Sequence, residues 1–351
     1  MNKKKTLKAV LAVLLAVILI AAAVVWMTFG NLVKSLMSVE RVGETQLFTM
    51  EFAGDYGFDT FMETGASSDG ELVQFVVKEL THGLPIEFDL PDLGCTTYVA
   101  TTEDGEHLFG RNFDMYYSPV MLTKTTPDNG YKSLTMVNLA YIGYNEDYLP
   151  VDLGSSVLTL CAPYAPMDGM NEKGLAVSVM LIDTVPTNQQ TDKLDVTTSS
   201  AIRMLLDKAA TVEEAIALLE NVDMHASANS CYHFLIGDAN GDSAVIEYIG
   251  DELSILRGEK ISTNFLLTPG EYDFGGGYDR YDIVKADLEA CGGILTEEGA
   301  MDVLEHAQNG IDSADDTSTT QWSCVYNLDK LTVDICVGAD FENVYSYSLM
   351  D

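Results

Sequence analysis

The chain has 351 residues, enough for one large domain with a sizeable core, and its 47% apolar and 21% charged residues are typical of a globular protein. The formal net charge is −35, because 54 acidic residues stand against 19 basic ones. A surface this acidic repels nucleic acid and anionic lipid, so the composition argues against a nucleic-acid-binding protein.

The N-terminus predicts a membrane anchor. Four lysines occur within residues 1–8, and no charged residue occurs from Ala9 to Phe29. An apolar run of this length can cross a bilayer as a helix, and the preceding lysines predict a cytoplasmic N-terminus. We therefore expect a cytoplasmic basic segment at 1–8, a transmembrane helix at 9–29, and a single-pass protein of the cell membrane with its remaining chain extracellular. A cleaved signal peptide and a buried soluble helix stay open as alternatives.

After this run, the residue pattern predicts strands and helices in separate groups. A helix is expected over 72–80, ending before Gly83, and an extended stretch over 85–94. Strands are expected over 95–102, 106–113, 133–144, 157–163 and 173–183. Helices follow over 199–210 and 211–222, then strands over 231–258 and 260–267, helices over 278–293 and 296–310, a loop over 311–320 and a hairpin over 321–338. Such runs favour an α+β fold with layers of helices and antiparallel sheet.

The six cysteines give no sign of a metal or redox centre. None lies close enough to another to form a CxxC pair, which weakens a zinc or thioredoxin-like reading, and six in a chain this long do not make a disulfide scaffold. The five histidines are scattered, and their spacing identifies no Cys-His pair. We therefore predict no metal and no cofactor.

The stretch "GCTTYVATTEDGEHLFGRNFDM", residues 94–115, predicts a hairpin that carries chemistry. With Asp104-Gly105 as the two central residues of a tight turn, Tyr98 faces Arg111 and Cys95 faces Asp114. Arg111 and Asp114 are three residues apart, and a regular pleat sends them to opposite faces. Both reach Cys95 only if the strand ends near Asn112 and the chain curls.

These residue types suit nucleophilic catalysis. A thiol is nucleophilic as the thiolate, and a nearby guanidinium lowers its pKa. If the peptide bond before Cys95 is cut, the residue gains an α-amine that can take the proton of its own side chain. Asp114 would then orient the amine. Gly94, which has no Cβ, lets the bond to be cut adopt a strained conformation.

This stretch resembles the start of the mature chain in the N-terminal-nucleophile linear-amide hydrolases. The group includes choloylglycine hydrolases, penicillin V acylases, acid-ceramidase-type amidases and the acyl-transferring enzyme of penicillin biosynthesis. The likeness covers roughly residues 94–351 and includes motifs at Cys95, Arg111, Asp114, Asn171 to Leu175, Asn264 and Arg280. It implies a four-layer αββα sandwich over residues 95–351, after a propeptide or linker at 30–94.

The resemblance also implies a mechanism. The chain would cut itself between Gly94 and Cys95, and the Cys95 thiol would attack a linear amide carbonyl. The Asn264 side chain and a backbone N–H would hold the negative oxygen, and Arg280 would be the second active-site arginine. Without the resemblance, Asn264 could equally be a turn residue and Arg280 a surface residue.

The sequence departs from some relatives after the Asn171 motif. Met180 and Leu181 stand where those relatives carry a polar side chain, so we expect an apolar substrate pocket, with Met115, Tyr116 and Tyr117 as further candidates to line it. The predicted function is an amidase for a small-molecule N-acyl amide. An acyltransferase of the same fold, a non-catalytic surface binding module and a homo-oligomer stay open.

Overall fold

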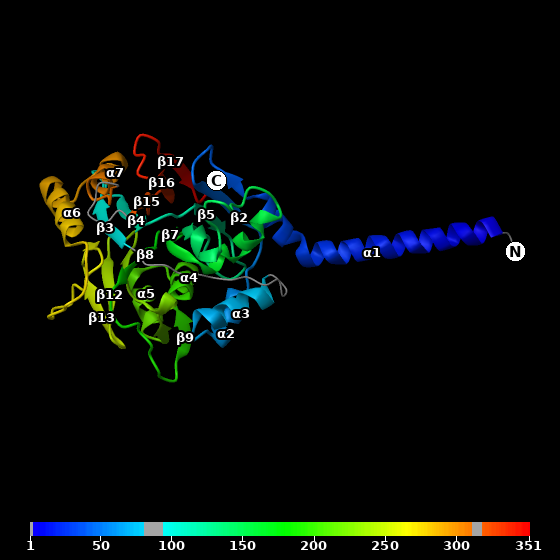
Figure 1. Ribbon diagram of the computed structural model, residues 1–351, viewed down its shortest axis with the longest axis horizontal. Coiled ribbons are helices and arrows are strands. Elements are labelled where there is room, and N and C mark those ends of the chain that lie inside the picture. The colour runs from blue at the N-terminus through cyan, green and yellow to red at the C-terminus, as the bar shows by residue number, and fades with distance from the viewer. Residues whose placement is uncertain (1–2, 81–93, 311–317) are drawn as a thin grey trace.

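The computed structural model describes residues 3–80, 94–310 and 318–351 (Figure 1). The predicted extended stretch up to residue 93 and most of the predicted loop at 311–320 lie outside these ranges. Within them the fold is a sandwich of two sheets, each covered on its outer side by helices. The α+β class predicted from the order of elements is therefore confirmed.

The larger sheet has nine strands, and residues from both sides of Cys95 build it. Its spatial order is β1 (Glu40–Arg41), β2 (Leu47–Phe52), β5 (Val120–Thr125), β6 (Ser133–Asn138), β7 (Pro166–Asn171), β8 (Ala176–Ile182), β11 (Cys231–Gly237), β12 (Ser243–Ile249) and β13 (Glu252–Arg257). Helices α4 (Thr198–Lys208) and α5 (Val212–Leu219) pack on its outer face. Thr197 and Thr211 cap these helices by accepting backbone N–H groups.

The smaller sheet has six strands and carries the hairpin that begins at Gly94. Its order is β14 (Ile261–Ser262), β3 (Gly94–Thr101), β4 (His107–Met115), β15 (Thr319–Asn327), β16 (Thr332–Val337) and β17 (Tyr345–Ser348). Helices α6 (Tyr278–Cys291) and α7 (Glu297–His306) cover its outer face. A parallel pair, β9 (Leu194–Thr197) and β10 (Val222–His225), stands apart.

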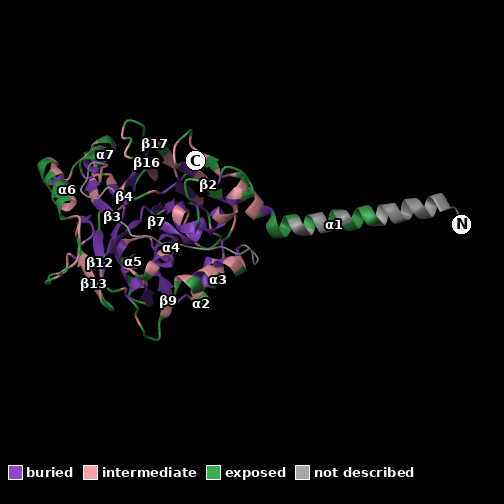
Figure 2. Cartoon of the chain, in the orientation of Figure 1, coloured by how far each residue is buried: buried purple, intermediate pink, exposed green. Residues whose placement is uncertain are grey.

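The two inner sheet faces form most of the core, which is the purple interior of Figure 2. Strands β3 and β8 touch across this interior. At Gly237 on β11, an added Cβ would lie 2.9 Å from the Val99 side chain on β3. The sheets therefore approach so closely here that only glycine fits.

One predicted strand is wrong, and another, at 260–267, is a strand only over Ile261–Ser262. Residues 157–163 belong to the 3₁₀ helix η2 (Ser155–Tyr164). The Asp152 carboxylate accepts the N–H groups of Gly154 and Ser155, and the Ser156 hydroxyl donates to the Asp152 carbonyl. These local bonds favour a helical turn over an extended strand. The predicted strand at 133–144 also ends early, at Asn138, where the 3₁₀ helix η1 (Leu139–Ile142) begins.

The segment before Cys95 is part of the folded body. Strand β2 pairs in parallel with β5 along its whole length. Helices α2 (Phe58–Thr64) and α3 (Asp69–Glu79) follow, and Phe61 packs edge-on against Tyr164. The Tyr56 hydroxyl donates to the buried Asp207 carboxylate at 2.7 Å. We call residues 30–80 the leader segment below.

The first helix, α1 (Lys3–Met37), extends away from the sandwich at its N-terminal end and contacts η2 and β2 near its C-terminal end (Figure 1). Over the described part of the chain, no helix combines the length and apolar character needed to span a bilayer. The structure thus gives no support to the anchor predicted at 9–29.

Candidate active site

The hairpin that carries Cys95 has a different register from the predicted one. Gly105 lies in the left-handed region, with φ of +83°, and its N–H donates to the Thr102 carbonyl. The loop therefore has three residues and ends in a left-handed glycine. Cys95 consequently faces Phe113, and Arg111 faces Thr97, so the predicted pairs are wrong by one residue.

This register removes the difficulty raised by the sequence. Cys95 and Thr97 point to the same face of β3, so Arg111 lies on the face of the sheet that carries the thiol. Strand β4 stays regular through Met115, and no curl near Asn112 is needed. Asp114 points to the opposite face, toward the helices, where it meets Arg280 from α6.

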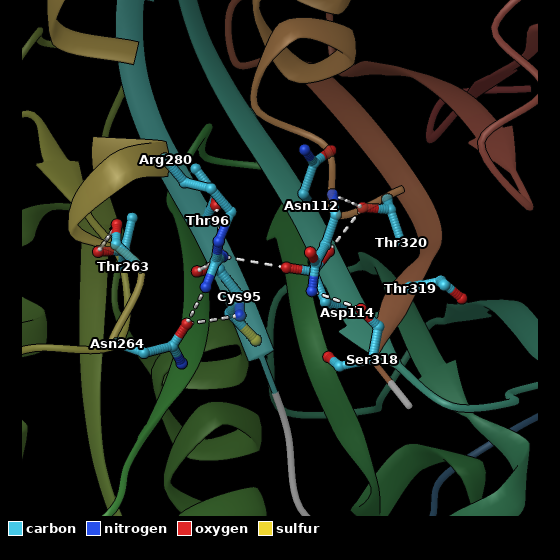
Figure 3. A network of polar contacts seen from close by, with 12 residues as sticks. Cys95, Thr96, Asn112, Asp114, Thr263, Asn264, Arg280, Ser318, Thr319 and Thr320 are labelled. Atoms are coloured by element: carbon cyan, nitrogen blue, oxygen red, sulfur yellow. Dashed lines mark hydrogen bonds and ion pairs between the residues drawn. The ribbon is translucent and has the colours of Figure 1, made fainter. Parts of the chain in front are cut away.

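Asn264 and Arg280 hold the backbone of Cys95 (Figure 3). The Cys95 N–H donates to Asn264 Oδ1 at 2.7 Å, and the Cys95 carbonyl accepts from Arg280 Nη1 at 2.6 Å. Arg280 Nη2 also donates to Asn264 Oδ1, at 2.9 Å. Because two N–H groups converge on this atom, it must be the amide oxygen. The Asn264 nitrogen then donates to the Leu181 carbonyl at 2.9 Å.

Arg280 connects four acceptors. Its Nη1 also reaches the Thr96 hydroxyl at 2.8 Å and the Asp114 carboxylate at 3.0 Å. The Thr320 hydroxyl donates a hydrogen bond to the other oxygen of the Asp114 carboxylate, at 2.7 Å. Gly277 makes the approach possible, since an added Cβ there would lie 2.7 Å from Arg280 Nη2. Arg280, whose side chain is 12% exposed, therefore connects β3, β4 and the loop that carries Asn264.

Arg111 lies fully buried on the thiol side of the sheet. Its Nε is 3.6 Å from the Asp168 carboxylate on β7, and both side chains have no exposed surface. Within the described chain, none of its three nitrogens has a hydrogen-bond partner. Trp322 and Tyr326 donate to Asp168 and hold it in place. A buried cation with unpaired donors is suited to stabilise negative charge that develops beside it.

Burial dominates the electrostatics of the thiol. It raises the pKa of Cys95 above the ordinary value, and the positive charge of Arg111 acts against this rise. The same burial raises the pKa of the Asp168 carboxyl, again against the effect of Arg111. In the uncut chain the Cys95 thiol therefore favours its protonated form at neutral pH.

The structure thus gathers Cys95, Arg111, Asp114, Asn264 and Arg280, but it arranges two of them differently from the prediction. Asn264, and not Asp114, is bonded to the Cys95 nitrogen, while Asp114 is bonded to Arg280. Their catalytic roles stay predictions. Over the described ranges, no group of three or more His, Cys, Asp or Glu side chains lies close enough to hold a metal ion.

The predicted pocket residues differ in how far they are buried. Met115 and Met180 are buried, and Leu181 contributes its carbonyl to Asn264. Tyr116 has 60% of its surface exposed, and Tyr117 is half-buried, so Tyr116 does not line an enclosed pocket. The apolar candidates therefore lie near the site, and the role of all five residues in lining a substrate pocket stays a prediction.

Sequence reasoning missed a buried pair that holds the Asn264 loop. His233 on β11 contacts the Thr263 carbonyl through Nε2 at 2.6 Å, so this nitrogen carries the proton. Its Nδ1 is 3.4 Å from Glu247 on β12. The Glu247 carboxylate in turn accepts the N–H groups of Leu267 and Thr268, at 2.6 and 2.9 Å. The pair fixes the chain on both sides of Asn264.

Replacing His233 with leucine is therefore expected to loosen Asn264. The change leaves the Thr263 carbonyl and the Glu247 carboxylate without one partner each, which we expect to cost about 1–3 kcal/mol in the free energy of unfolding. Glutamine, which retains an N–H donor, should restore part of the loss. Urea unfolding measures the effect, and equal stability of the leucine and glutamine variants would contradict the assignment.

Comparisons with known proteins agree with this geometry. Residues 95–274 match the model of the linear amide C-N hydrolases, choloylglycine hydrolase family, which is half of the chain. A bile salt hydrolase/transferase of Clostridium perfringens is 29% identical over 171 residues, 46% of this chain and 50% of the relative. The matched part thus spans half the length of that curated relative.

Solved structures share the fold. A mutant conjugated bile acid hydrolase from Clostridium perfringens aligns with a TM-score of 0.53 and 18% identity, over 72% of this chain and 92% of that one. Penicillin V acylase from Agrobacterium tumefaciens aligns with a TM-score of 0.54 and 19% identity, over 73% of this chain and 87% of that one. The match begins at Cys95, the residue on which the observed contacts converge. The chain belongs to the choloylglycine hydrolase family of linear amide C-N hydrolases.

Proposed function

We propose that the protein hydrolyses a linear N-acyl amide with Cys95 as an N-terminal nucleophile, after cutting itself between Gly94 and Cys95. One observation carries the proposal. The nitrogen and carbonyl of Cys95 are held by Asn264 and Arg280, while the buried Arg111 lies on the side of its thiol. Contacts that fix both the nitrogen and the carbonyl of Cys95 suit a nitrogen that becomes the base after the cut.

The self-cleavage is an acyl shift from nitrogen to sulfur. The Cys95 sulfur attacks the Gly94 carbonyl carbon, and the C–N bond breaks as the nitrogen takes a proton. Water then hydrolyses the resulting thioester, which leaves a carboxylate on Gly94 and a free amine on Cys95. Asn264 Oδ1, which accepts from this nitrogen in the intact chain, would accept from the amine afterwards.

Amide hydrolysis follows the same path. The free amine takes the thiol proton, the thiolate attacks the substrate carbonyl, and the leaving amine departs with a proton. The Asn264 amide has two N–H donors, of which one is bonded to Leu181 and the second is left for the oxyanion. Water releases the acyl group from Cys95 as a carboxylic acid.

The self-cleavage should accelerate with rising pH. Because burial raises the thiol pKa in the intact chain, the thiolate fraction is small at neutral pH and grows about tenfold per pH unit until the pH reaches that pKa. The rate of appearance of a new N-terminus at Cys95, followed from pH 6 to 9 by mass spectrometry, measures the effect. A rate that is flat or falls over this range would contradict a thiolate nucleophile.

The direct test of the function has two parts. N-terminal sequencing of purified protein should find a chain that begins at Cys95, and a panel of N-acyl amides should show release of the free amine. Bile salt conjugates, penicillin V, N-acylethanolamines, ceramides and acyl-homoserine lactones form the panel. An intact chain without turnover of any of them would reject the proposal.

An acyltransferase reaction is the second candidate, since the name of the curated relative includes both hydrolase and transferase. In that case an added amine, and not water, takes the acyl group from Cys95. Product analysis in the presence of an acceptor amine separates the two outcomes.

The cellular location is a further proposal, supported by sequence alone. The lysines of residues 1–8 and the uncharged run at 9–29 favour a membrane protein with an extracellular catalytic domain. Fractionation of cells that express the full chain, with protease added from outside, tests it. Protein found only in the soluble cytoplasmic fraction would reject this location.

A further inference from the structure

The buried ion pair between Arg111 and Asp168 is open. Arg111 Nε is 3.6 Å from the Asp168 carboxylate, beyond the roughly 2.7–3.2 Å of an N–H···O hydrogen bond, and neither side chain has any exposed surface. A guanidinium and a carboxylate that are free to approach each other form two parallel hydrogen bonds of about 2.7–2.9 Å. Other contacts must therefore hold this carboxylate back from Arg111.

Two donors from β15 hold Asp168. The Tyr326 hydroxyl donates to its Oδ1 at 2.5 Å, and the Trp322 indole N–H donates to its Oδ2 at 3.2 Å. Strand β4, which carries Arg111, lies between β15 and β3, which carries Cys95. Asp168 is thus held on the side of Arg111 away from the thiol. Among the described residues, Nη1 and Nη2 of Arg111 have no hydrogen-bond partner.

A second buried arginine–aspartate pair in the same chain is closed. Arg203 Nη2 is 2.8 Å from Asp207 Oδ1, four residues later on α4. Tyr56 of the leader segment contacts both oxygens of this carboxylate, each at 2.7 Å. One tyrosine bond is thus compatible with a closed pair, whereas Asp168, with a separate donor on each oxygen, stays open.

The contacts of Asp168 stabilise its charged form. Burial raises the pKa of the Asp168 carboxyl, and Arg111, Tyr326 and Trp322 act against this rise. The ionised carboxylate balances the charge of Arg111, which would be strongly destabilising without a partner in the interior of the sandwich. The open pair therefore keeps the charge balance and still leaves N–H donors unused.

Arg111 is the group through which Asp168 acts on the thiol. The charged and titratable groups around Cys95 are Arg111 and Asp114 of β4, Arg280 of α6 and Tyr141 of η1. Those around Asp168 are Arg111 of β4 and Cys324 and Tyr326 of β15. Because Arg111 belongs to both sets, a change in its pairing with Asp168 alters the field at the Cys95 sulfur.

We propose that Asp168 and Tyr326 are positioning residues of the reaction at Cys95. Tyr326 keeps the Asp168 carboxylate close enough to balance the charge of Arg111, but too far away to take up its N–H donors. These donors stay free for the negative charge that develops on the Cys95 sulfur and on the carbonyl that it attacks. The inference rests on the proposed amidase function and deepens it.

Two variants are expected to move the titration of the Cys95 thiol in opposite directions. With Tyr326→Phe, Asp168 loses one donor and closes on Arg111, so the midpoint of the titration should rise by about one pH unit. With Asp168→Asn, the charge of Arg111 acts on the thiol without opposition, and the midpoint should fall by about one unit. The self-cleavage rate at neutral pH should then be about tenfold lower for Tyr326→Phe. Shifts in the same direction would overturn the proposal.

The midpoint is measured by NMR of the full chain with isotope-labelled cysteine Cβ atoms, and Cys95→Ser assigns the signal of Cys95. Each variant is compared with the wild type in the same state, cut or uncut. Tyr56→Phe is the matched control, since it also removes a hydroxyl from a buried aspartate that pairs with an arginine. It should lower stability and leave the midpoint unchanged. A shift equal to that of Tyr326→Phe would contradict the assignment.

The double variant Tyr326→Phe/Asp168→Asn tests the order of the contacts. Without the carboxylate nothing can close on Arg111, so its midpoint should equal that of Asp168→Asn alone. Shifts that simply add would mean that Tyr326 acts independently of Asp168, against the proposal. If Asp168→Asn does not fold, the contrast between Tyr326→Phe and Tyr56→Phe decides.

The NMR titration needs no turnover, so it separates failure of the inference from failure of the function. Opposite shifts in a protein that neither cuts itself nor hydrolyses an amide keep the control of Arg111 by Asp168 and Tyr326, and reject the amidase. Self-cleavage and amide turnover with the same midpoint in the wild type and both variants keep the amidase, and reject the roles of Asp168 and Tyr326.

Discussion

Replacing Cys95 with alanine is expected to leave the chain as one uncut polypeptide without amidase activity. The change removes the sulfur that attacks Gly94 in the first reaction and the substrate carbonyl in the second. Loss of a covalent nucleophile in a comparable enzyme lowers kcat roughly 10⁶-fold, so activity should fall to background. Mass spectrometry of the purified variant, together with an assay of amine release, measures both effects.

Cys161 provides the matched control. It is also fully buried and free, and burial raises its pKa to about 12. Cys161→Ala should cut itself and hydrolyse substrate like the wild type, apart from a small loss of stability. A fragment beginning at residue 95 in the Cys95→Ala variant, or turnover by that variant, would be incompatible with the proposed chemistry.

The second large effect is expected from Arg280→Met. This change removes the donors to Cys95, Thr96, Asp114 and Asn264 at once. It leaves the fully buried Asp114 carboxylate with Thr320 as its hydrogen-bond donor. Breaking a buried ion pair from one side typically costs about 3–5 kcal/mol in the free energy of unfolding. We also expect kcat to fall at least about a hundredfold, because Asn264 loses the contact that orients it.

Arg257→Met is the control for loss of an arginine ion pair. Arg257 pairs with Glu213, but both side chains are more than half exposed. Exposed pairs contribute about 0–1 kcal/mol, so this variant should unfold and turn over much like the wild type. Arg280→Lys should lie between the two, since an ammonium keeps the charge but cannot reach all four acceptors. If Arg280→Met and Arg257→Met have the same stability and the same turnover, the assignment of Arg280 to the active site is wrong.

The sequence allowed most elements to be predicted where one local signal was clear. Helices α4 to α7 lie close to their predicted ranges, and the order of strands and helices was enough for the layered fold. Strand β7 was missed, because Pro166, Gly169 and Asn171 are poor strand formers. Its pairing with β6 and β8 overrides that local preference, and at Gly169 an added Cβ would lie 2.6 Å from the Leu134 carbonyl.

The candidate active site, too, could be predicted only where a local signal in the sequence was clear. The length of the hairpin loop, two or three residues, decides which face of the sheet Arg111 occupies. The residue types around Asp104-Gly105 are equally compatible with both lengths. Asp168, His233 and Glu247 were missed because they act only through contacts from other strands. Family resemblance located Asn264 and Arg280, but it did not foresee that Asn264 accepts from the Cys95 nitrogen.

The place of β2 inside the larger sheet has a consequence for recovery from heat or denaturant. In the newly made chain, β2 is tethered to its neighbours, so docking against β5 is a reaction within one molecule. Once Gly94 and Cys95 are separated, the same docking needs an encounter between two pieces, and its rate depends on concentration. We expect the uncut precursor to refold readily at high dilution, whereas the processed enzyme should not. The lifetime of the processed enzyme is therefore set by the rate at which it unfolds.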